Sequence, residues 1–454
     1  MVSIKKIFSS EIDMLHGSLW DKIILFAIPL ALTGVMQQLF NAADVAVLGK
    51  FVGKNAMAAV GNNTSLIGLL VNLFLGLSLG ANVVIARNIG AGRNDKAQIA
   101  VHTAFLLALY IGFGIAILGE LIVSPTMDFL EVPLEVKSMA EIYMRIYLAG
   151  MPVIGIYNFE SAIFRSRGDT KTPLISLAIG SLINILLNLL FVTQFNLGIH
   201  GVAWATVIAN AVSAAILFRA LRKTDSVIHI DTHALKINKD CLKEIVNIGL
   251  PAGIQGMVFS LSNLLIQAAI NILGADVMAA SAAAFTIEIN IYCILSAFGQ
   301  AATTFVSQNY GARNLPRCKK VTWLAMLLNF IFMGILSAFI LIFAEPLLRF
   351  FNDDPDVIYF GKIRLFYIVA PEIINVFMEG LSGAMRGYGI SLAPAILSLF
   401  GVCGIRITWL YTAFVWLPSY ETLMAVYPIS WLVTTILLYF AYRFYMKHHV
   451  NYFS

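Results

Sequence analysis

One acid and three neutral polar residues lie inside otherwise apolar stretches in the first half of the chain. Asp44 is the only charge in the run IPLALTGVMQQLFNAADVAVLG, which starts at Ile28, and its companions are Asn184, Asn188 and Thr206. A carboxylate in a bilayer interior is costly unless it is paired, solvated or used. These side chains suggest the binding of a proton or Na⁺, with the acid supplying the charge and its companions supplying oxygen atoms.

The position of Asp44 leaves two interpretations open. Counting at about 1.5 Å per residue from Asp21, the acid lies roughly 35 Å along its helix, where it could reach the outer interface and be balanced by Lys50. The alternative, which we favour, is a protonatable or Na⁺-binding side chain. Asn184 and Asn188 are four residues apart, which puts both on one face of a helix.

The composition requires a membrane protein. Among 454 residues, 59% are hydrophobic and only 12% are charged, and the mean hydropathy is +0.83, whereas soluble domains carry about a quarter of charged residues. The net charge of +5 is typical of cytosolic loops in such a protein, so we expect no nucleic-acid partner. The cysteines are scattered without CxxC spacing or neighbouring His, which indicates neither a zinc site nor a disulfide framework.

Segments of about 20 apolar residues predict about twelve transmembrane helices and an all-α fold. The first residues carry Lys5 and Lys6 but no small-residue cleavage site, so we expect no cleaved signal. The helices are expected to start near Trp20, Ala56, Gln98, Lys137, Pro173, Gly201, Glu244, Asp276, Val321, Ile358, Ser391 and Leu423.

Lys and Arg set the expected orientation, because cytosolic loops carry more of them than outer loops do. The richer side of the helix map is therefore cytosolic, which places both termini on the cytosolic side of the membrane. Of the 30 Lys and Arg residues, those on the poorer, outer side are Lys50, Lys54, Lys137, Arg145, Arg349, Lys362 and Arg364.

The two halves of the sequence repeat. When the second half is aligned with the first, Pro29 falls on Pro251, and further along, after two short gaps, Glu160 falls on Glu379. Two six-helix halves that start on the same side are parallel repeats, a pattern of secondary transporters, whose binding site lies between the halves. We therefore expect an N-terminal bundle, a cytosolic linker and a C-terminal bundle, formed by residues 1–221, 222–243 and 244–454.

The polar cluster of the first half is not repeated in the second half. Because a symmetric scaffold would not need this asymmetry, we place the ion-coupling chemistry in the N-terminal bundle. The second-half equivalents of Asp44, Asn184, Asn188 and Thr206 are, in this order, Ile266, Ile405, Trp409 and Tyr427.

A further set of acids, amides and adaptable side chains is expected to line a central cavity. Met side chains suit varied ligands because they are flexible and polarizable. The acids have structural alternatives: two of them precede an arginine by seven residues, and the third could be a buried, hydrogen-bonded acid. The expected cavity residues are Gln37, Glu160, Met257, Asn263, Glu288 and Glu379.

Arginines near these acids suggest ion pairs. Glu160 precedes Arg167, and Glu379 precedes Arg386, by two helical turns, so a structural network at the cytosolic end of the cavity is an open alternative. Arg406, in CGIRITW, is the one basic residue well inside a predicted span. We expect it to neutralise Glu379 or Glu288 across the second bundle, the usual arrangement for an intramembrane charge.

Several stretches together resemble the MATE (multidrug and toxic compound extrusion) family. The resemblance covers nearly the whole chain and implies twelve helices in two bundles, with export of bulky, often cationic compounds in exchange for Na⁺ or H⁺. The stretches are the Asp44 helix, GLSLGANVVIARNIGAGRNDKA after Leu75, FRSRGDTKTP after Ile163, GIHGVAWATVIAN after Leu197, and GVCGIRITW after Phe400.

The resemblance also implies roles for single residues. Asp44 matches the family's first-helix acid, and Asn184 and Thr206 match the two polar residues that accompany it. Asn188 departs from the family, because many members have a second Asp at this position. An Na⁺ site built on two carboxylates would here have one, which still balances a monovalent cation.

Two other functions were weighed. A flippase for lipid-linked saccharides shares this architecture but needs a groove lined with several Arg and Lys, and only Arg406 is deep in a span. A membrane-embedded enzyme needs a nucleophile with a base or metal ligands, yet His102 and His200 are solitary. We expect a non-enzymatic antiporter that works by alternating access, as a monomer in membrane lipid, on small organic cations or drugs, with no cofactor apart from a bound Na⁺.

Overall fold

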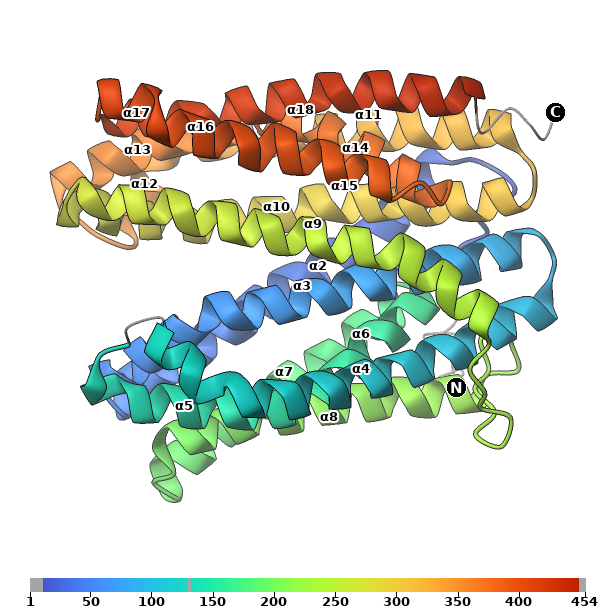
Figure 1. The fold of residues 1–454 in the computed structure, drawn as a ribbon, viewed down its shortest axis with the longest axis horizontal. Coiled ribbons are helices and arrows are strands. Elements are labelled where there is room, and N and C mark those ends of the chain that lie inside the picture. The colour runs from blue at the N-terminus through green and yellow to red at the C-terminus, as the bar shows by residue number, and fades with distance from the viewer. Residues whose placement is uncertain (1–10, 130–131, 449–454) are drawn as a thin grey trace. The chain divides into compact units, whose positions relative to one another are not determined.

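The structure, a computed structural model, describes residues 11–129 and 132–448, and every regular element in these two ranges is a helix (Figure 1). Long apolar segments favour helices because a helix satisfies its own backbone hydrogen bonds. The segment around Lys5 and Lys6 lies outside the described residues.

Two short π-helical segments, η1 and η2, occur among the α-helices. In chain order the elements are α2 (Trp20–Phe51), α3 (Lys54–Gly90), α4 (Asn94–Phe129), α5 (Leu134–Ala149), α6 (Met151–Ser166), α7 (Lys171–Leu189), η1 (Leu190–Gln194), α8 (Gly198–Lys223), α9 (Lys239–Ile272), α10 (Ala275–Gly311), α11 (Leu315–Ile342), α12 (Ala344–Arg349), α13 (Pro355–Val369), α14 (Glu372–Gly387), α15 (Leu392–Ser398), η2 (Leu399–Gly404), α16 (Ile405–Tyr411), α17 (Ala413–Trp416) and α18 (Tyr420–His448).

Ten helical segments in the described ranges are long and apolar enough to cross a membrane, or eleven with the pair α5 and α6, which bend by 49° where they meet. We expected about twelve spans. The expected span near Ile358 corresponds to α13 and α14, which are only 15 and 16 residues long. They also carry Lys362, Arg364, Glu372 and Glu379, so no long uncharged stretch runs through them.

The chain forms two compact units, which we describe separately. Unit 1 comprises Met1–Ile12 and Leu32–Gly253, and unit 2 comprises Asp13–Ala31 and Ile254–Ser454. These bounds assign the start of α2 to unit 2 and the start of α9 to unit 1. The sequence-based division at residues 222–243 stays a prediction.

Both long helices that change unit carry an internal proline close to the change. Pro29 lies in α2, two residues before Ala31, where the assignment of that helix changes from unit 2 to unit 1. Pro251 lies in α9, two residues before Gly253, where the assignment changes from unit 1 to unit 2. A proline inside a helix removes one backbone hydrogen bond and bends or loosens the helix. The repeat of these two prolines thus marks the same structural position in both halves.

Unit 1 is held together by close helix packing and by a loop that is hydrogen-bonded to a helix. The first part of α9 approaches α3 so closely that a Cβ on Gly249 would lie 2.6 Å from the Cα of Leu77. Only glycine, which has no Cβ, fits at this position without a clash. The connection between α8 and α9 is fixed to α4 because the His102 ring accepts a hydrogen bond from the backbone N–H of Asp231 at 3.2 Å. His102 is therefore a structural residue of this connection.

In unit 2, α10 packs against α11, α13 and α14, and α18 packs against α13 and α14 (Figure 1). The start of α2 takes part in this core, because the ring of Phe26 packs edge-to-face against the ring of Phe305 of α10 at 5.6 Å between centroids. Both rings are fully buried. Unit 2 therefore needs a helix segment that lies far from the rest of the unit in the sequence.

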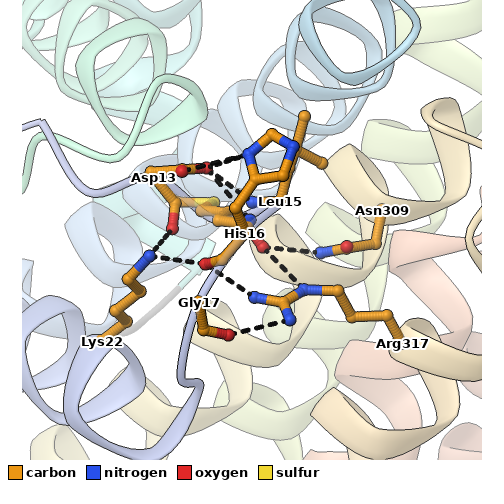
Figure 2. A network of polar contacts seen from close by, with 8 residues as sticks. Asp13, Leu15, His16, Gly17, Lys22, Asn309 and Arg317 are labelled. Carbon is orange, nitrogen blue, oxygen red and sulfur yellow. Dashed lines mark hydrogen bonds and ion pairs between the residues drawn. The ribbon is translucent and has the colours of Figure 1, made fainter.

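Residues 13–17, which we call the N-terminal strap, are bound to α10 and α11 mainly through backbone carbonyls (Figure 2). The Arg317 guanidinium donates to the carbonyls of Met14 at 3.2 Å, His16 at 3.1 Å and Gly17 at 3.0 Å. Asn309 donates to the Met14 carbonyl at 3.1 Å. One cation thus satisfies three carbonyls that no helix or strand would satisfy.

The strap is also ordered from within (Figure 2). The Asp13 carboxylate accepts hydrogen bonds from the backbone N–H groups of Leu15 at 2.9 Å and His16 at 3.2 Å, and Lys22 donates to the Asp13 carbonyl at 2.7 Å. Although partial burial opposes it, these hydrogen bonds hold the pKa of Asp13 below its usual range. Its contribution to stability is present above the unfolded-state pKa of about 3.9 and is lost as the pH falls through the lower folded pKa.

We expect Arg317→Ala to release the strap, because the variant loses all three carbonyl contacts while α10 and α11 keep their apolar packing. The measurement is limited trypsin digestion of the purified protein, and cleavage after Lys22 should accelerate. Lys320→Ala, an exposed cation one turn along α11, is the matched control. Equal cleavage rates in the two variants would contradict the role that we assign to Arg317.

Candidate functional site

The polar cluster predicted from the sequence is assembled by α2, α7 and α8 of unit 1. Asn184 and Asn188 lie on the buried face of α7, which packs along α8. The helix widens into the π-helical segment η1 directly after this face, two residues beyond Asn188. Such π-helical turns are frequent at functional sites because they change the direction of neighbouring side chains.

Both oxygens of Asp44 accept hydrogen bonds from this face. Asn188 Nδ2 donates to Oδ1 at 2.6 Å, and Thr206 Oγ1 lies 2.8 Å from Oδ2. Asn188 Nδ2 also lies 3.0 Å from the Asn184 Oδ1 atom, and Asn184 Nδ2 lies 3.4 Å from Thr206 Oγ1. The four residues therefore form one closed network, as their spacing in the sequence suggested.

The network is buried, and no basic side chain of the described residues belongs to it. Asp44 and Thr206 are 3% exposed, and Asn184 and Asn188 are fully buried. The balancing role considered for Lys50 is not seen, because this side chain is exposed and its Nζ lies over the Phe51 ring, 5.6 Å from the centroid. No Lys or Arg in the described ranges forms an ion pair with Asp44.

One acceptor in the network is left over. Asn188 Oδ1 is buried and has no hydrogen-bond partner among the described residues. With the carboxylate, Asn184 Oδ1 and Thr206 Oγ1, it makes a set of oxygen atoms of the kind that hard cations prefer. The described residues contain no group of three or more His, Cys, Asp or Glu that could hold a metal ion, so the set offers a single negative charge and fits a proton or one monovalent cation.

The second-half equivalents of these residues form no acid cluster. Ile266 is buried in α9 at 1% exposure, and Tyr427 of α18 contacts Trp431 edge-to-face at 5.9 Å between ring centroids. The Trp409 indole N–H donates to the Thr422 carbonyl at 2.8 Å. The asymmetry seen in the sequence thus corresponds to two different local structures.

The two cavity candidates of unit 1 differ in their surroundings. Gln37 is half-buried. Glu160 is fully buried, and neither of its carboxylate oxygens has a hydrogen-bond partner among the described residues. The ion pair considered for Glu160 and Arg167 is wrong, because Arg167 instead pairs with Glu11 at 2.5 Å. The spacing of Glu160 and Arg167 puts both on one helix face, but Arg167 pairs with Glu11, an acid outside that helix.

Two of the unit 2 candidates form ion pairs. Glu288 is bound by Arg364 through two hydrogen bonds of 2.8 and 2.9 Å, and both side chains are buried. Glu379 lies 3.9 Å from Arg386, which also donates to Gln255 at 2.7 Å. These contacts support the structural alternative that we left open for the two acids.

The other unit 2 candidates lie on α9, and one of them contacts Arg406. Met257 is half-buried and Asn263 is exposed. The ion pair expected between Arg406 and Glu379 or Glu288 is wrong: Arg406 donates to Asn263 at 2.7 Å and lies over the Tyr427 ring. The two acids have their own arginines, so neither is available to it.

A family model described as MatE matches residues 29–190 and again residues 251–412. The chain belongs to the MatE family. The first match begins at Pro29 and the second at Pro251, the two prolines that the sequence repeat pairs. The internal repeat found in the sequence is therefore a repeat of the family's own unit.

Relatives of this MatE chain match it over most of its length. The chain is 28% identical to "Probable multidrug resistance protein YoeA" of Bacillus subtilis, with 95% of each chain covered. It is also 28% identical to "Probable multidrug resistance protein NorM" of Thermotoga maritima, with 85% of this chain and 84% of the relative covered. Its fold is similar to an outward-facing multidrug resistance MATE family transporter, with a TM-score of 0.90, 23% identity, and coverage of 97% and 98%.

Membership of the MatE family confirms three predictions. The chain is an all-helical, multi-pass membrane protein, its fold is the one that the resemblance implied, and it is a transporter rather than an enzyme. Family membership does not assign the coupling ion, the substrate or the role of any single residue.

Sequence reasoning missed Arg364 as the partner of Glu288, because we assigned it to an outer loop. It is a buried residue of α13. The repeat held a signal: the alignment that pairs Glu160 with Glu379 also pairs Arg145 with Arg364, and Arg145 pairs with Glu120 in unit 1. An arginine that pairs with an acid from another helix therefore occurs at this position in both halves.

We expect Arg364→Met to destabilise unit 2 by about 3–5 kcal/mol, because it leaves the Glu288 carboxylate buried without its partner. The measurement is thermal unfolding of the detergent-purified protein. The double variant Glu288→Met/Arg364→Met should recover much of the loss, since no isolated charge remains. A double variant less stable than Arg364→Met alone would contradict this explanation, and Arg349→Ala, which breaks the exposed pair with Glu345, serves as a control with a small effect.

Proposed function

We propose that this MatE chain exports drug-like organic compounds across a bacterial inner membrane in exchange for Na⁺ or H⁺, with Asp44 as the ion-coupling acid. The observation that carries the proposal is the Asp44 network: an acid 3% exposed, hydrogen-bonded only to neutral side chains, with an unused acceptor beside it. The names of the two bacterial relatives, both probable multidrug resistance proteins, support the substrate class.

The coupling follows from the charge of the network. Burying an ionised carboxylate without a cation is costly, and hydrogen bonds from an amide and a hydroxyl offset only part of this cost. A bound proton or Na⁺ neutralises the acid and removes the remainder. Ion binding therefore changes the relative stability of conformations that differ in how α2, α7 and α8 pack around Asp44, and alternating access uses this difference.

Asn188 allows either ion to be bound. As it stands, its amide N–H donates to the ionised carboxylate. Rotated by half a turn, the same side chain presents Oδ1, which accepts a hydrogen bond from a protonated acid or contributes a ligand oxygen to Na⁺. One net inward-moving charge gains about 2.3 kcal/mol per 100 mV, which corresponds to roughly a fiftyfold concentration gradient of an uncharged exported compound. For a monovalent cation, the ion gradient itself supplies the driving force.

Glu160 supports cationic compounds as substrates. It is the unit 1 acid outside the Asp44 network that is fully buried and without a hydrogen-bond partner among the described residues. Glu288 and Glu379 of unit 2 are balanced by arginines and attract cations less. We place both termini in the cytosol, as the distribution of Lys and Arg predicts.

The flippase alternative gains no support from the arginines. A pyrophosphate groove needs several basic side chains that are free to bind phosphate. In unit 2, Arg364 binds Glu288 through two hydrogen bonds, and Arg386 is engaged by Gln255 and Glu379. Most of the buried basic charge of this unit is therefore already used within the protein.

We expect Asp44→Asn to abolish ion-driven export while the protein stays folded. An asparagine keeps the shape of the side chain. Its oxygen can still accept from Thr206, and its NH2 group can donate to Asn188 once that amide rotates to present Oδ1, but it cannot exchange a charge. The measurement is ethidium efflux from proteoliposomes under an imposed Na⁺ gradient and, separately, under a pH gradient. Asp225→Asn, an exposed acid of the α8–α9 connection, is the matched control and should export at the normal rate.

Retained export by Asp44→Asn under either gradient would remove Asp44 from the coupling mechanism. Wild-type protein that responds to neither gradient would overturn the antiporter proposal as a whole.

We expect Asn188→Asp to strengthen Na⁺ coupling, because it adds a second carboxylate where Asn188 Nδ2 now lies 2.6 Å from Asp44. Two acids that close repel each other unless a cation lies between them. The measurement is the Na⁺ concentration for half-maximal export, which should fall by roughly tenfold. Asn184→Asp, one turn earlier on α7, is a comparison variant; an unchanged Na⁺ dependence in both variants would favour coupling to H⁺.

A further inference from the structure

Unit 2 contains a second buried polar cluster, built around a base. Arg406 of α16 is 4% exposed, and its Nη1 donates to Asn263 Oδ1 of α9 at 2.7 Å. Its guanidinium carbon lies 4.3 Å from the centroid of the Tyr427 ring of α18, a distance at which a cation is attracted to the ring face. Side chains of α9, α16 and α18 thus converge on one guanidinium, although α9 lies far from the other two helices in the sequence.

The base cluster lies close to the place that the repeat assigns to the acid cluster. Tyr427 is the equivalent of Thr206, and Arg406 is the neighbour of Ile405, the equivalent of Asn184. Asn263 lies one helical turn before Ile266, the equivalent of Asp44. The repeated helices therefore assemble an acid with neutral partners in unit 1 and a base with neutral partners in unit 2.

Arg406 differs from Arg364 and Arg386 because it has no carboxylate within ion-pair distance; the buried Glu372 of α14 acts on it only from further away. Arg364 and Arg386 each have a carboxylate within ion-pair distance, whereas no carboxylate in the described ranges is that close to Arg406. Its Nε is buried without a hydrogen-bond partner. A guanidinium carries five N–H donors in a planar fork, and only one acceptor is supplied here.

The scaffold does not require this base. The alignment that pairs Asn184 with Ile405 makes Ile185 the first-half equivalent of Arg406, and the helix there packs along α8 without a charge at this position. A buried charge with unused donors is costly, so its presence is explained most simply by an anion that it binds for part of the transport cycle. Asn263 is exposed, which gives the guanidinium a polar neighbour at the surface of the unit.

We propose that Arg406, positioned by Asn263 and Tyr427, binds the carboxylate of a transported aromatic compound. This inference rests on the proposed export function and narrows the substrate class to compounds that carry a carboxylate beside their aromatic rings, including zwitterions. A planar carboxylate can accept two parallel hydrogen bonds from the guanidinium fork. Beside the guanidinium lies a buried edge-to-face pair of aromatic rings, Tyr427 and Trp431, against which aromatic rings pack favourably.

The test compares two dyes that differ in one group: a rhodamine with a free carboxylate and its methyl ester. Binding is measured by fluorescence polarisation on purified protein in nanodiscs without any ion gradient, so failure of ion-driven export leaves the assay intact. We expect Arg406→Gln to weaken binding of the free acid roughly ten- to hundredfold and binding of the ester less than about twofold. Asn263→Ala should give a smaller loss for the acid alone.

Two further variants separate recognition from structure. Arg406→Lys keeps the charge but not the planar fork and should recover part of the binding of the free acid. Gln267→Ala changes an exposed side chain one turn along α9, which bonds only Asn271 in the structure, and should bind both dyes normally. Thermal unfolding is measured for each variant.

Equal losses for the acid and the ester in Arg406→Gln, or no loss for either, would overturn the proposal. An effect that requires phosphatidylglycerol in the nanodisc would also overturn it, because the anion would then be a lipid phosphate. Normal dye binding by wild-type protein that fails to export under any gradient would count against the proposed function and leave the anion site standing.

Discussion

In unit 1, one carboxylate is buried among neutral side chains, and its ionised form therefore has a high free energy. Asp44 is 3% exposed and receives hydrogen bonds from Asn188 and Thr206 but no ion pair from the described residues. Hydrogen bonds to a charged group contribute about 1.5–3 kcal/mol each, which is less than the cost of desolvating an isolated carboxylate. In the function that we propose, the packing of α2, α7 and α8 is therefore coupled to the presence of a cation, because the described residues of the network include no basic side chain. A lysine or arginine in the same place would stabilise the acid permanently and end its sensitivity to ions.

Unit 2 uses charge in the opposite way. Glu288 of α10 is bound by Arg364 of α13, a pair that joins two helices, and Glu379 lies near Arg386 of its own helix α14. These acids need no external ion. Arg406 is the exception, and it directly follows Ile405, the repeat equivalent of Asn184. The two repeats share helix order but carry opposite charges in this neighbourhood, which a duplicated scaffold permits because each copy can change without the other.

The sequence was sufficient to predict the fold and the acid network because both leave strong local signals. Asp44 interrupts an apolar run, Asn184 and Asn188 repeat at helical spacing, and the internal repeat shows where symmetry is broken. Pairing between distant side chains was predicted less well. Glu288 pairs with Arg364, and Arg167 pairs with Glu11, and neither pair was predicted. The rotation of each helix about its axis decides which faces meet, and the spacing of residues within one helix does not determine that rotation. The sequence also did not predict that α2 and α9 are each divided between the two units. A single apolar run gives no indication of which neighbours its two ends will contact.

The N-terminal strap has a consequence for the order of synthesis. Residues 13–31 leave the ribosome long before Arg317 and Phe305, which bind the strap and Phe26 and lie far along the chain. At roughly 5–20 residues per second, the start of α2 waits some tens of seconds for its permanent contacts. During that interval the Met14 and Gly17 carbonyls lack Arg317, and α2 is inserted without its final neighbours. Completion of unit 2 is therefore necessarily post-insertional, and an early arrest of translation leaves α2 without the unit to which its start belongs.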